Sequence, residues 1–209
     1  QNVMHANDAI AETNRQFLAK KNLPLLNVMA SPGGGKTTLL MTTIKGLEGR
    51  LRVAAIEGDT ASQVDSDKVS TLGVPVVQID TAGECHLDAP LVREALEALP
   101  LEDIDLVLLE NIGNLICPAE FALGESLNVV ILSVPEGDDK PYKYPGMFMR
   151  ADVVVISKID LLPYLDFDVE AFKKLVLSVN PRVKFFEISC KTGEGVDIWC
   201  DWVADFTAQ

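Results

Sequence analysis

Positive charge, histidine and long hydrophobic runs are all scarce in this chain of 209 residues. Lysine and arginine number 18 against 31 acidic residues, and the resulting net charge of −13 is unsuited to contacting nucleic acid phosphates or an anionic membrane. No apolar run has the length that crosses a bilayer, and the opening residues lack the pattern of a signal peptide. We therefore expect a cytoplasmic protein that binds neither nucleic acid nor membrane.

Cysteine is also sparse, and its four occurrences show no C-x-x-C spacing: Cys85, Cys117, Cys190 and Cys200. In a chain of this size and type, scattered cysteines indicate reduced cytosolic thiols rather than a disulfide framework. Apolar residues make up 48% of the sequence, which is enough for a substantial core, and no linker or repeat divides the chain. We predict one domain over residues 1–209.

Hydrophobic periodicity predicts an α/β fold. Residues 2–20 are expected to form an amphipathic N-terminal helix packed on the domain, because apolar residues recur there at helical spacing. Apolar or β-branched runs typical of doubly buried strands then alternate with helical patterns. The strands are expected at 25–29, 52–57, 74–79, 106–111, 128–134, 153–157 and 184–188, and helices at 39–47, 62–72, 88–99, 168–179 and 195–206. This alternation predicts a mostly parallel sheet of about seven strands with helices on both faces.

Residues 30–38 read ASPGGGKTT and lie between a predicted strand and a predicted helix. This is the layout of a phosphate-binding P-loop, in which glycine backbone N–H groups surround a polyphosphate at a helix N-terminus. Lys36 is expected to face the terminal phosphates and the Thr37 hydroxyl to ligate Mg²⁺, while Ala30 stands where the first glycine usually occurs. The predicted phosphate-binding residues are Gly33, Gly34, Gly35, Lys36, Thr37 and Thr38.

Residues after the last two predicted strands favour guanine as the base. Residues 157–160 (SKID) are similar to the Asn-Lys-x-Asp segment of GTP-binding proteins, whose carboxylate accepts hydrogen bonds from guanine N1–H and the 2-amino group. Ser157 replaces the asparagine, so we expect a weaker bracing hydrogen bond. Adenine would face Asp160 with the wrong pattern, and mismatched buried polar groups cost about 1–3 kcal/mol each. The predicted base-binding residues are Lys158, Asp160, Ser189, Cys190 and Lys191, the last three being similar to a Ser-Ala-Lys element.

Two strand ends compete to serve Mg²⁺ and the attacking water. Residues 80–83 (DTAG) have the D-x-x-G pattern of a Ras-like switch, whereas Glu110 ends an apolar strand-like run. A further acidic turn at 57–60 (EGDT) follows the second predicted strand. Spacing does not determine which strand lies beside the P-loop strand, so the residues alone leave this choice open.

Cys85 and His86 are adjacent, and Cys117 follows another strand end. Two thiolates and an imidazole suit Zn²⁺ or Ni²⁺. Three ligands do not close a tetrahedral site, so a water or a two-fold partner would complete the coordination. The alternative is a pair of unreactive buried thiols beside a surface histidine. Their position on the nucleotide side of the sheet favours a metal site.

Four further segments are long and distinctive: 85–89 (CHLDA), 110–119 (ENIGNLICPA), 136–141 (EGDDKP) and 158–168 (KIDLLPYLDFD). Together with the P-loop they resemble the hydrogenase nickel-incorporation GTPases (the HypB family), within the SIMIBI class of P-loop proteins. The resemblance covers nearly the whole chain. It implies that residues 80–83 are a false copy of the Ras-like switch and that Mg²⁺ lies near Thr37, Asp59 and Glu110.

The resemblance also implies a cytosolic metallochaperone that binds GTP or GDP and forms a GTP-dependent homodimer. Cys85, His86 and Cys117 would bind Ni²⁺ or Zn²⁺ at the dimer interface, for delivery of nickel to the hydrogenase large-subunit precursor with a HypA-type nickel chaperone as partner. The catalytic candidates for phosphoryl transfer to water are Lys36, Asp59 and Glu110. Asp59 is the first candidate to orient the water, and slow turnover is expected because no arginine finger is evident.

The sequence begins at Gln1 and contains neither the N-terminal Cys-x-x-Cys-type motif nor the His-rich tract of some family members, so nickel storage is not predicted. Three alternatives remain. A sister GTPase serving urease or a cobalamin enzyme would be expected to lack segments 138–141 and 163–168. A small-molecule kinase would leave Asp160 without a purpose. A metal-storage module with vestigial nucleotide binding would not need Lys36.

Overall fold

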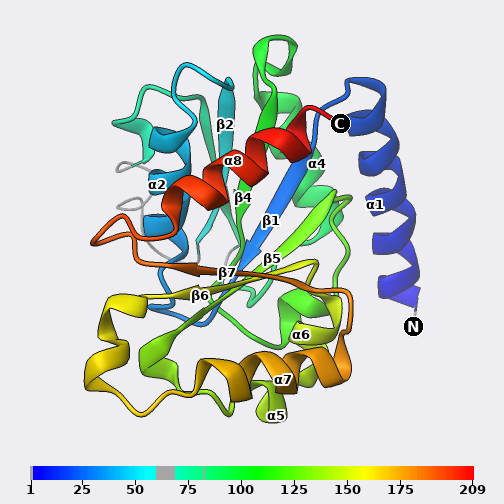
Figure 1. Cartoon of the computed structure of the whole chain (residues 1–209). Coiled ribbons are helices and arrows are strands. Elements are labelled where there is room, and N and C mark those ends of the chain that lie inside the picture. Colours follow the sequence, from blue (N-terminus) through cyan, green and yellow to red (C-terminus); the bar gives the residue numbers. More distant parts are fainter. Residues whose placement is uncertain (1, 60–68, 82) are drawn as a thin grey trace.

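The computed structural model describes residues 2–59, 69–81 and 83–209 (Figure 1). Seven parallel strands form one sheet in the order β3-β2-β4-β1-β5-β6-β7. The strands are β1 (Leu25–Met29), β2 (Val53–Asp59), β3 (Val76–Asp80), β4 (Leu106–Glu110), β5 (Leu127–Ser133), β6 (Val153–Ser157) and β7 (Lys184–Ile188). Every residue of β1, β4 and β6 is buried, which is why these strands read as continuous apolar runs.

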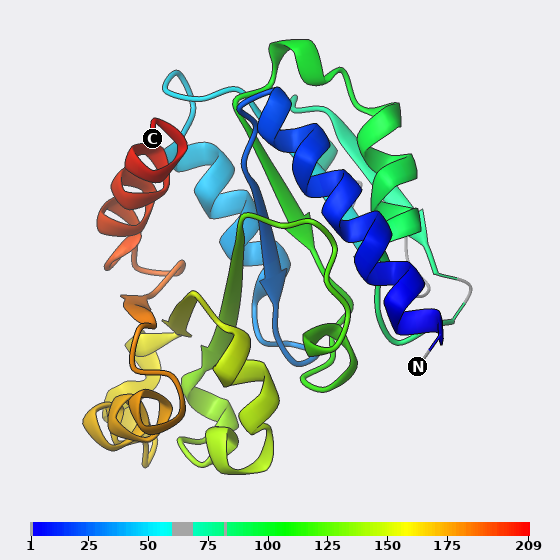
Figure 2. The ribbon, with the colours of Figure 1, turned by 90° about the vertical axis from the view of Figure 1, so that its right-hand side faces the viewer.

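Helices cover both faces of the sheet (Figures 1 and 2). The α-helices are α1 (Asn2–Lys20), α2 (Lys36–Gly46), α4 (Ala89–Ala98), α5 (Lys140–Lys143), α6 (Pro145–Arg150), α7 (Val169–Val179) and α8 (Val196–Thr207). Short 3₁₀ helices are η1 (Leu101–Asp103), η2 (Cys117–Ala119), η3 (Val134–Glu136) and η4 (Ile159–Tyr164). On one face α2 and α8 contribute to a single apolar cluster, and on the other face α1 with α4, and α6 with α7, form two more.

Side-chain alternation along the strands divides the core between these faces. In β4, Leu106 and Leu108 join the cluster under α2 and α8, whereas Val107 and Leu109 join the cluster under α1 and α4. Successive strand residues point to opposite faces, so each apolar run supplies two layers of core at once.

The predicted elements agree closely with the structure. The parallel sheet, the N-terminal helix and the strands are confirmed, with strand ends displaced by at most two residues. The helix expected at 62–72 lies largely outside the described residues. Helices α5 and α6, between β5 and β6, were not predicted, because Pro141, Pro145 and Gly146 interrupt any helical pattern there.

The described helices include none with both the length and the apolarity that crossing a bilayer requires. Because all the strands are parallel, their carboxyl ends meet along one edge of the sheet. Ligands of open parallel sheets bind at that edge, so the loops after each strand are the place to look for chemistry.

Candidate nucleotide site and cysteine–histidine cluster

The P-loop (residues 30–38) joins β1 to α2 with a backbone that requires glycine. Gly33 and Gly35 have φ angles of 74° and 99°, in the left-handed region that other residues rarely adopt. A Cβ on Gly34 would lie 2.9 Å from Ala30 Cβ. Gly35 is the N-cap of α2 and supplies no side-chain cap, so the first N–H groups of the helix are available to an anion.

Glu110 lies directly against the start of α2. Strand β4 pairs with β1 so that Val28 is opposite Glu110, and this register brings the carboxylate to the P-loop. Thr37 Oγ1 donates to Glu110 Oε1 at 3.0 Å, and Lys36 Nζ lies 4.0 Å from the same oxygen. A hydroxyl and a carboxylate side by side are the oxygen ligands that Mg²⁺ prefers, so this donor set fits the ion.

The strand order answers the question that spacing left open. Strand β4 lies beside β1, whereas β3 is at the edge of the sheet with β2 and β4 between it and β1. Asp80 therefore ends an outer strand, and the Ras-like interpretation of residues 80–83 does not fit this sheet. Asp59 is the last residue of β2, next to β4, and its side chain lies outside the described part of the chain.

A cavity of about 300 Å³ adjoins the P-loop on the side of β6. Four of the five predicted base-binding residues line it, all except Ser189. The full lining is Gly35, Thr38, Leu39, Ser157, Lys158, Asp160, Leu161, Cys190 and Lys191. Ser189 Oγ donates to Asp160 Oδ1 at 2.7 Å, which fixes the carboxylate at the cavity. Burial raises the pKa of the Cys190 thiol, so a neutral group faces this space at physiological pH.

Two side chains connect the cavity to the P-loop backbone. Lys158, with a φ of 60°, donates through Nζ to Gly33 O at 2.9 Å. Ser157 Oγ donates to Gly34 O at 3.1 Å. Ser157 therefore keeps a hydrogen bond to the P-loop, and that this bond is weaker than one from asparagine stays a prediction.

Glu136 is a site residue that sequence reasoning did not identify. It accepts hydrogen bonds from Ser133 N at 2.8 Å and Ser133 Oγ at 2.7 Å, and a further one from Ser31 Oγ of the P-loop. Glu136 lies in η3, just beyond the end of β5. Its presence in the distinctive segment 136–141 was the only available signal.

Cys85, His86 and Cys117 gather at the same edge of the sheet, and we refer to them as the cysteine–histidine cluster. Cys85 Sγ lies 3.0 Å from Cys117 Sγ and 3.8 Å from His86 Nδ1. The hydrogen bond to Cys117 raises the pKa of the Cys85 thiol, ahead of the smaller effect of burial. A metal bound here would have to displace that thiol proton.

Within the described residues, no group of three or more His, Cys, Asp or Glu side chains is arranged to hold a metal ion. The cluster thus brings its three predicted ligands close together without enclosing an ion in one chain. Further ligands would have to come from water or from a second copy.

Two loops carry the cluster: cluster loop 1 (residues 83–88) and cluster loop 2 (residues 111–126). The His86 ring stacks on Phe121, with centroids 3.8 Å apart and an angle of 19° between the planes. Asn114 Nδ2 donates to Cys85 O at 3.3 Å. Sequence reasoning missed Phe121 and Asn114, because nothing local marks contacts between loops that leave different strands.

Cluster loop 2 also touches the P-loop. It begins directly after Glu110, and a Cβ on Gly113 would lie 3.2 Å from Pro32 Cα and 3.3 Å from Lys36 Nζ. The chain therefore runs against the phosphate-binding loop four residues before it reaches Cys117. The two candidate sites share one continuous segment.

Comparison with known proteins gives consistent matches. The family model described as "CobW/HypB/UreG, nucleotide-binding domain" matches residues 24–187. The hydrogenase maturation factor HypB of Escherichia coli (strain K12) is 46% identical over 202 residues, covering 96% of this chain and 69% of the relative.

Two solved structures are similar over almost their full length. HypB from Archaeoglobus fulgidus has a TM-score of 0.90 at 39% identity, covering 97% of this chain and 99% of the other. HypB from Helicobacter pylori in complex with nickel has a TM-score of 0.92 at 36% identity, covering 97% and 95%.

Proposed function

The chain belongs to the HypB family of hydrogenase maturation factors, among the CobW/HypB/UreG nucleotide-binding domains, and from this premise we propose that it is a GTP-hydrolysing nickel chaperone. The observation that carries the proposal is the continuity of its two sites. One segment contributes Glu110 to the P-loop and Cys117 to the cysteine–histidine cluster. A nucleotide bound at one end can thus act on a metal held at the other.

The proposed nucleotide is GTP, hydrolysed to GDP. Asp160, oriented by Ser189, would accept hydrogen bonds from the guanine edge, while Lys36 would neutralise charge on the β- and γ-phosphates. Thr37 and Glu110 would hold Mg²⁺, and the ion would supply positive charge against the charge that develops on the phosphates. Asp59 remains the first candidate to orient the attacking water, with Glu110 the second.

The proposed cargo is Ni²⁺ or Zn²⁺, held by Cys85, His86 and Cys117. The similarity to a HypB structure in complex with nickel supports this choice, as do the distances within the cluster. The incomplete ligand set of one chain favours a homodimer in which two clusters are pooled. Cys85 is exposed and Cys117 half-buried, as a site at an interface requires.

Nucleotide and metal are proposed to be coupled through cluster loop 2. Gly113 lies against Pro32 and Lys36, so a γ-phosphate that repositions the lysine would also move the loop that ends in Cys117. Such coupling is reciprocal in free energy: if GTP strengthens nickel binding, nickel must strengthen GTP binding by the same factor.

The coupling is tested by measuring Ni²⁺ affinity with GDP and with a non-hydrolysable GTP analogue. We expect the two affinities to differ by about 5-fold or more, the lower end of ordinary allosteric coupling. Lys36→Ala, which removes the phosphate-facing charge, should abolish the difference. Equal affinities with the two nucleotides in the wild-type protein would refute the coupling.

The wider role is cytosolic delivery of nickel to the [NiFe]-hydrogenase large-subunit precursor, with a HypA-type nickel chaperone as partner. The family membership supports this over a sister GTPase for urease or a cobalamin enzyme. Transfer of ⁶³Ni from the loaded protein to the purified precursor, with GTP or GDP present, tests it. Transfer independent of Lys36 would instead favour a metal-storage module.

A further inference from the structure

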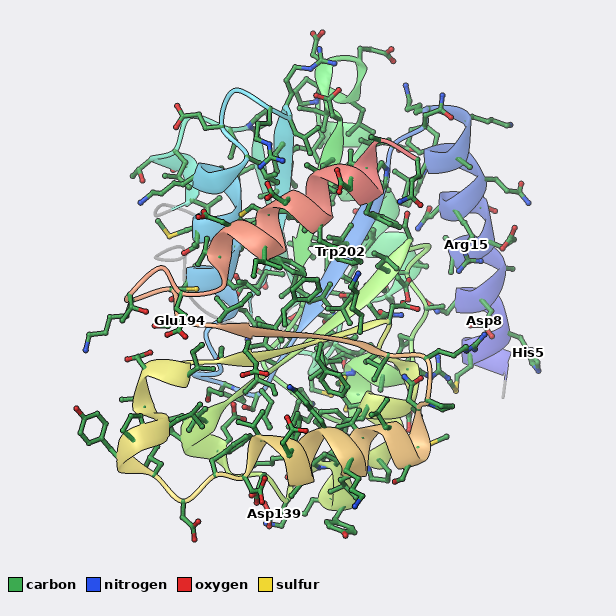
Figure 3. The ribbon with its side chains drawn as sticks, in the orientation of Figure 1. His5, Asp8, Arg15, Asp139, Glu194 and Trp202 are labelled. Atoms are coloured by element: carbon green, nitrogen blue, oxygen red, sulfur yellow. The ribbon has the colours of Figure 1, made fainter. Side chains whose placement is uncertain are left out.

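One side of α1 is buried against the rest of the molecule, and among the described side chains of the helix half of the buried ones are polar. They recur every four or three residues, as on one side of an α-helix: Asn7, Ala11, Asn14 and Leu18. The other side is exposed, and His5 on it points away from the sheet in Figure 3. Apolar side chains suffice to dock an amphipathic helix, so the two asparagines require a separate explanation.

Each asparagine connects the first residue of α4, directly after cluster loop 1, to cluster loop 2. Asn7 accepts a hydrogen bond from Ala89 N at 2.8 Å and donates to Ala122 O at 2.9 Å. Asn14 donates to Ala89 O at 2.9 Å and to Leu123 O at 3.0 Å. Ala89 directly follows cluster loop 1, whereas Ala122 and Leu123 belong to cluster loop 2. The pair, which we call the asparagine clamp, therefore joins the end of cluster loop 1, at the start of α4, to cluster loop 2.

Cluster loop 2 is shaped to receive the clamp. Gly124 has a φ of 97°, and a Cβ there would lie 2.5 Å from Asn14 Cβ and 2.7 Å from Ala11 O. Only glycine permits this approach. Because the backbone of the loop comes so close to α1, the short amide of Asn14 can reach Leu123 O.

The clamped residues adjoin the side chains of the cysteine–histidine cluster. Ala122 follows Phe121, whose ring stacks on His86 at 3.8 Å, and Ala89 lies three residues beyond that histidine. The two cysteine sulfur atoms, one from each loop, are 3.0 Å apart, with Cys85 exposed and Cys117 half-buried. A shift of one loop against the other at the clamp would change the distances among all three side chains.

The polar clamp has a cost that simple helix docking would not incur. Asn14 is completely buried, and its Oδ1 has no hydrogen-bond partner among the described residues. An unpaired buried acceptor is destabilising, and an apolar side chain of similar size would avoid the penalty. Directional hydrogen bonds instead fix a relative position, as a single buried asparagine fixes register in a coiled coil.

We propose that Asn7 and Asn14 of α1 are positioning residues for the cysteine–histidine cluster, setting the separation of cluster loops 1 and 2. This inference rests on the proposed function only in assigning the cluster to metal binding. Helix α1 thereby acts as a structural part of the metal site, although it contributes none of the three predicted ligands.

The test compares Asn7→Ala and Asn14→Ala with the wild-type protein in Ni²⁺ binding. Each variant should bind Ni²⁺ about tenfold more weakly, the lower end of the effect of losing an outer partner of a metal site. The nickel–thiolate charge-transfer absorption should shift as well, because the ligand geometry changes. Each single variant keeps the other asparagine, so the two loops retain one connection and the fold is preserved.

The matched control is Asn180→Ala. Asn180 makes the same kind of bonds, donating to Phe148 O at 2.9 Å and Ala151 O at 2.6 Å, but joins α6 to α7 instead of the cluster loops. It should lower the unfolding midpoint without moving the nickel affinity or spectrum. If Asn7→Ala and Asn14→Ala behave like this control, the clamp has only a structural role and the proposal is overturned.

A metal-independent measurement separates this proposal from the proposed function. Phenylarsine oxide condenses with two neighbouring thiols, releasing water, and its capture by Cys85 and Cys117 reports their proximity. Capture should slow in both clamp variants relative to Asn180→Ala, and unchanged capture contradicts the clamp. The Cys85→Ala/Cys117→Ala double variant tests the other proposal: if it binds Ni²⁺ as tightly as the wild-type protein, the metal assignment fails whatever the arsenical shows.

Discussion

Asp160 lines the cavity beside the P-loop, and Ser189 donates a hydrogen bond to it. This bond orients the carboxylate. Guanine offers two donors to a carboxylate, the N1–H and the 2-amino group. An amide in the same place would present a donor to one of them. At the scale of single residues, this carboxylate is therefore the group that we propose selects the nucleotide.

Asp160→Asn should weaken GDP binding by about 5- to 150-fold, since a mismatched buried hydrogen bond costs about 1–3 kcal/mol. The same variant should gain affinity for xanthosine diphosphate, whose 2-oxo group accepts from the new amide. Titration of the wild-type protein and the variant with GDP and with xanthosine diphosphate measures both affinities. Asp166→Asn, an exposed carboxylate on the following segment, is the control and should change neither affinity. GDP binding by Asp160→Asn at the wild-type level would contradict the assignment.

Cys200 supplies a second prediction at this scale. It is 2% exposed, and burial raises the pKa of its thiol to about 11, from an ordinary value near 9. Because the folded-state pKa is the higher one, the folded protein binds more protons, so the contribution to stability is complete below pH 9 and is lost as pH rises through 11. Two pKa units correspond to at most about 3 kcal/mol in the free energy of unfolding.

Urea unfolding at pH 8 and pH 10.5 tests this contribution in wild-type protein and Cys200→Ala. The wild-type protein should lose more stability between the two pH values than the variant, which has no thiol at this position to ionise. Lysines and tyrosines titrate equally in both proteins and cancel in the comparison. Identical losses would show that Cys200 ionises as readily in the folded state as in the unfolded chain.

At the scale of elements, the position of β4 beside β1 decides the chemistry of the phosphate site. The pairing puts the carboxylate of Glu110 3.0 Å from the Thr37 hydroxyl, whereas β3 and its terminal Asp80 are separated from β1 by two strands. Asp80 and Glu110 each end a strand with a carboxylate, and the order of the strands in the sheet is what gives them different expected roles.

Glu110→Gln should reduce GTP hydrolysis by about 10–100-fold and raise the Mg²⁺ concentration needed for half-maximal rate, since the substitution removes the charge of a residue proposed to hold Mg²⁺. Asp80→Asn is the matched substitution on the outer strand and should leave both quantities nearly unchanged. A phosphate-release assay over a range of Mg²⁺ concentrations measures both. A larger loss in Asp80→Asn than in Glu110→Gln would restore the Ras-like interpretation.

Segment 136–141 shows a similar dependence on neighbouring elements. Glu136 ends η3, which directly follows β5, and it accepts a hydrogen bond from the Ser31 hydroxyl of the P-loop. Strand β5 is the other neighbour of β1, so the segment after it also brings a carboxylate to the loop. The P-loop is thereby held on the side of β4 by Glu110 and on the side of β5 by Glu136.

At the scale of the whole molecule, charge opposes the assembly that the proposed function needs. Two copies with a net charge of −13 each repel one another, so a dimer requires short-range contacts or bound cations to offset the field. A divalent metal shared between two cysteine–histidine clusters would supply both a bound cation and a short-range contact between the copies.

Sizing by light scattering should therefore show a larger dimer fraction with the GTP analogue and Ni²⁺ together than with GDP alone. Raising the salt from 50 to about 300 mM should increase the fraction further by screening the repulsion. Cys85→Ala should lose the response to Ni²⁺ and keep the response to salt. A monomer under every condition would exclude the shared-ligand arrangement.

The sequence by itself determined the strands and most of the helices, and it located the proposed nucleotide site. Buried parallel strands need apolar side chains on both faces, so each strand could be predicted from its own apolar run. The P-loop and the SKID segment at 157–160 could be recognised because each depends on residues adjacent in the chain. These features are local, so the order of residues in the sequence is enough to predict them.

Only the tertiary structure decided how the strands lie side by side and which loops meet. Whether Glu110 or Asp80 reaches the P-loop depends on the sheet order, and the contact of Cys85 with Cys117 joins loops that leave non-neighbouring strands. The contacts of Asn7 span more than 80 residues to Ala89 and more than 100 to Ala122. Such contacts arise from the packing of elements already formed, so no spacing along the chain records them.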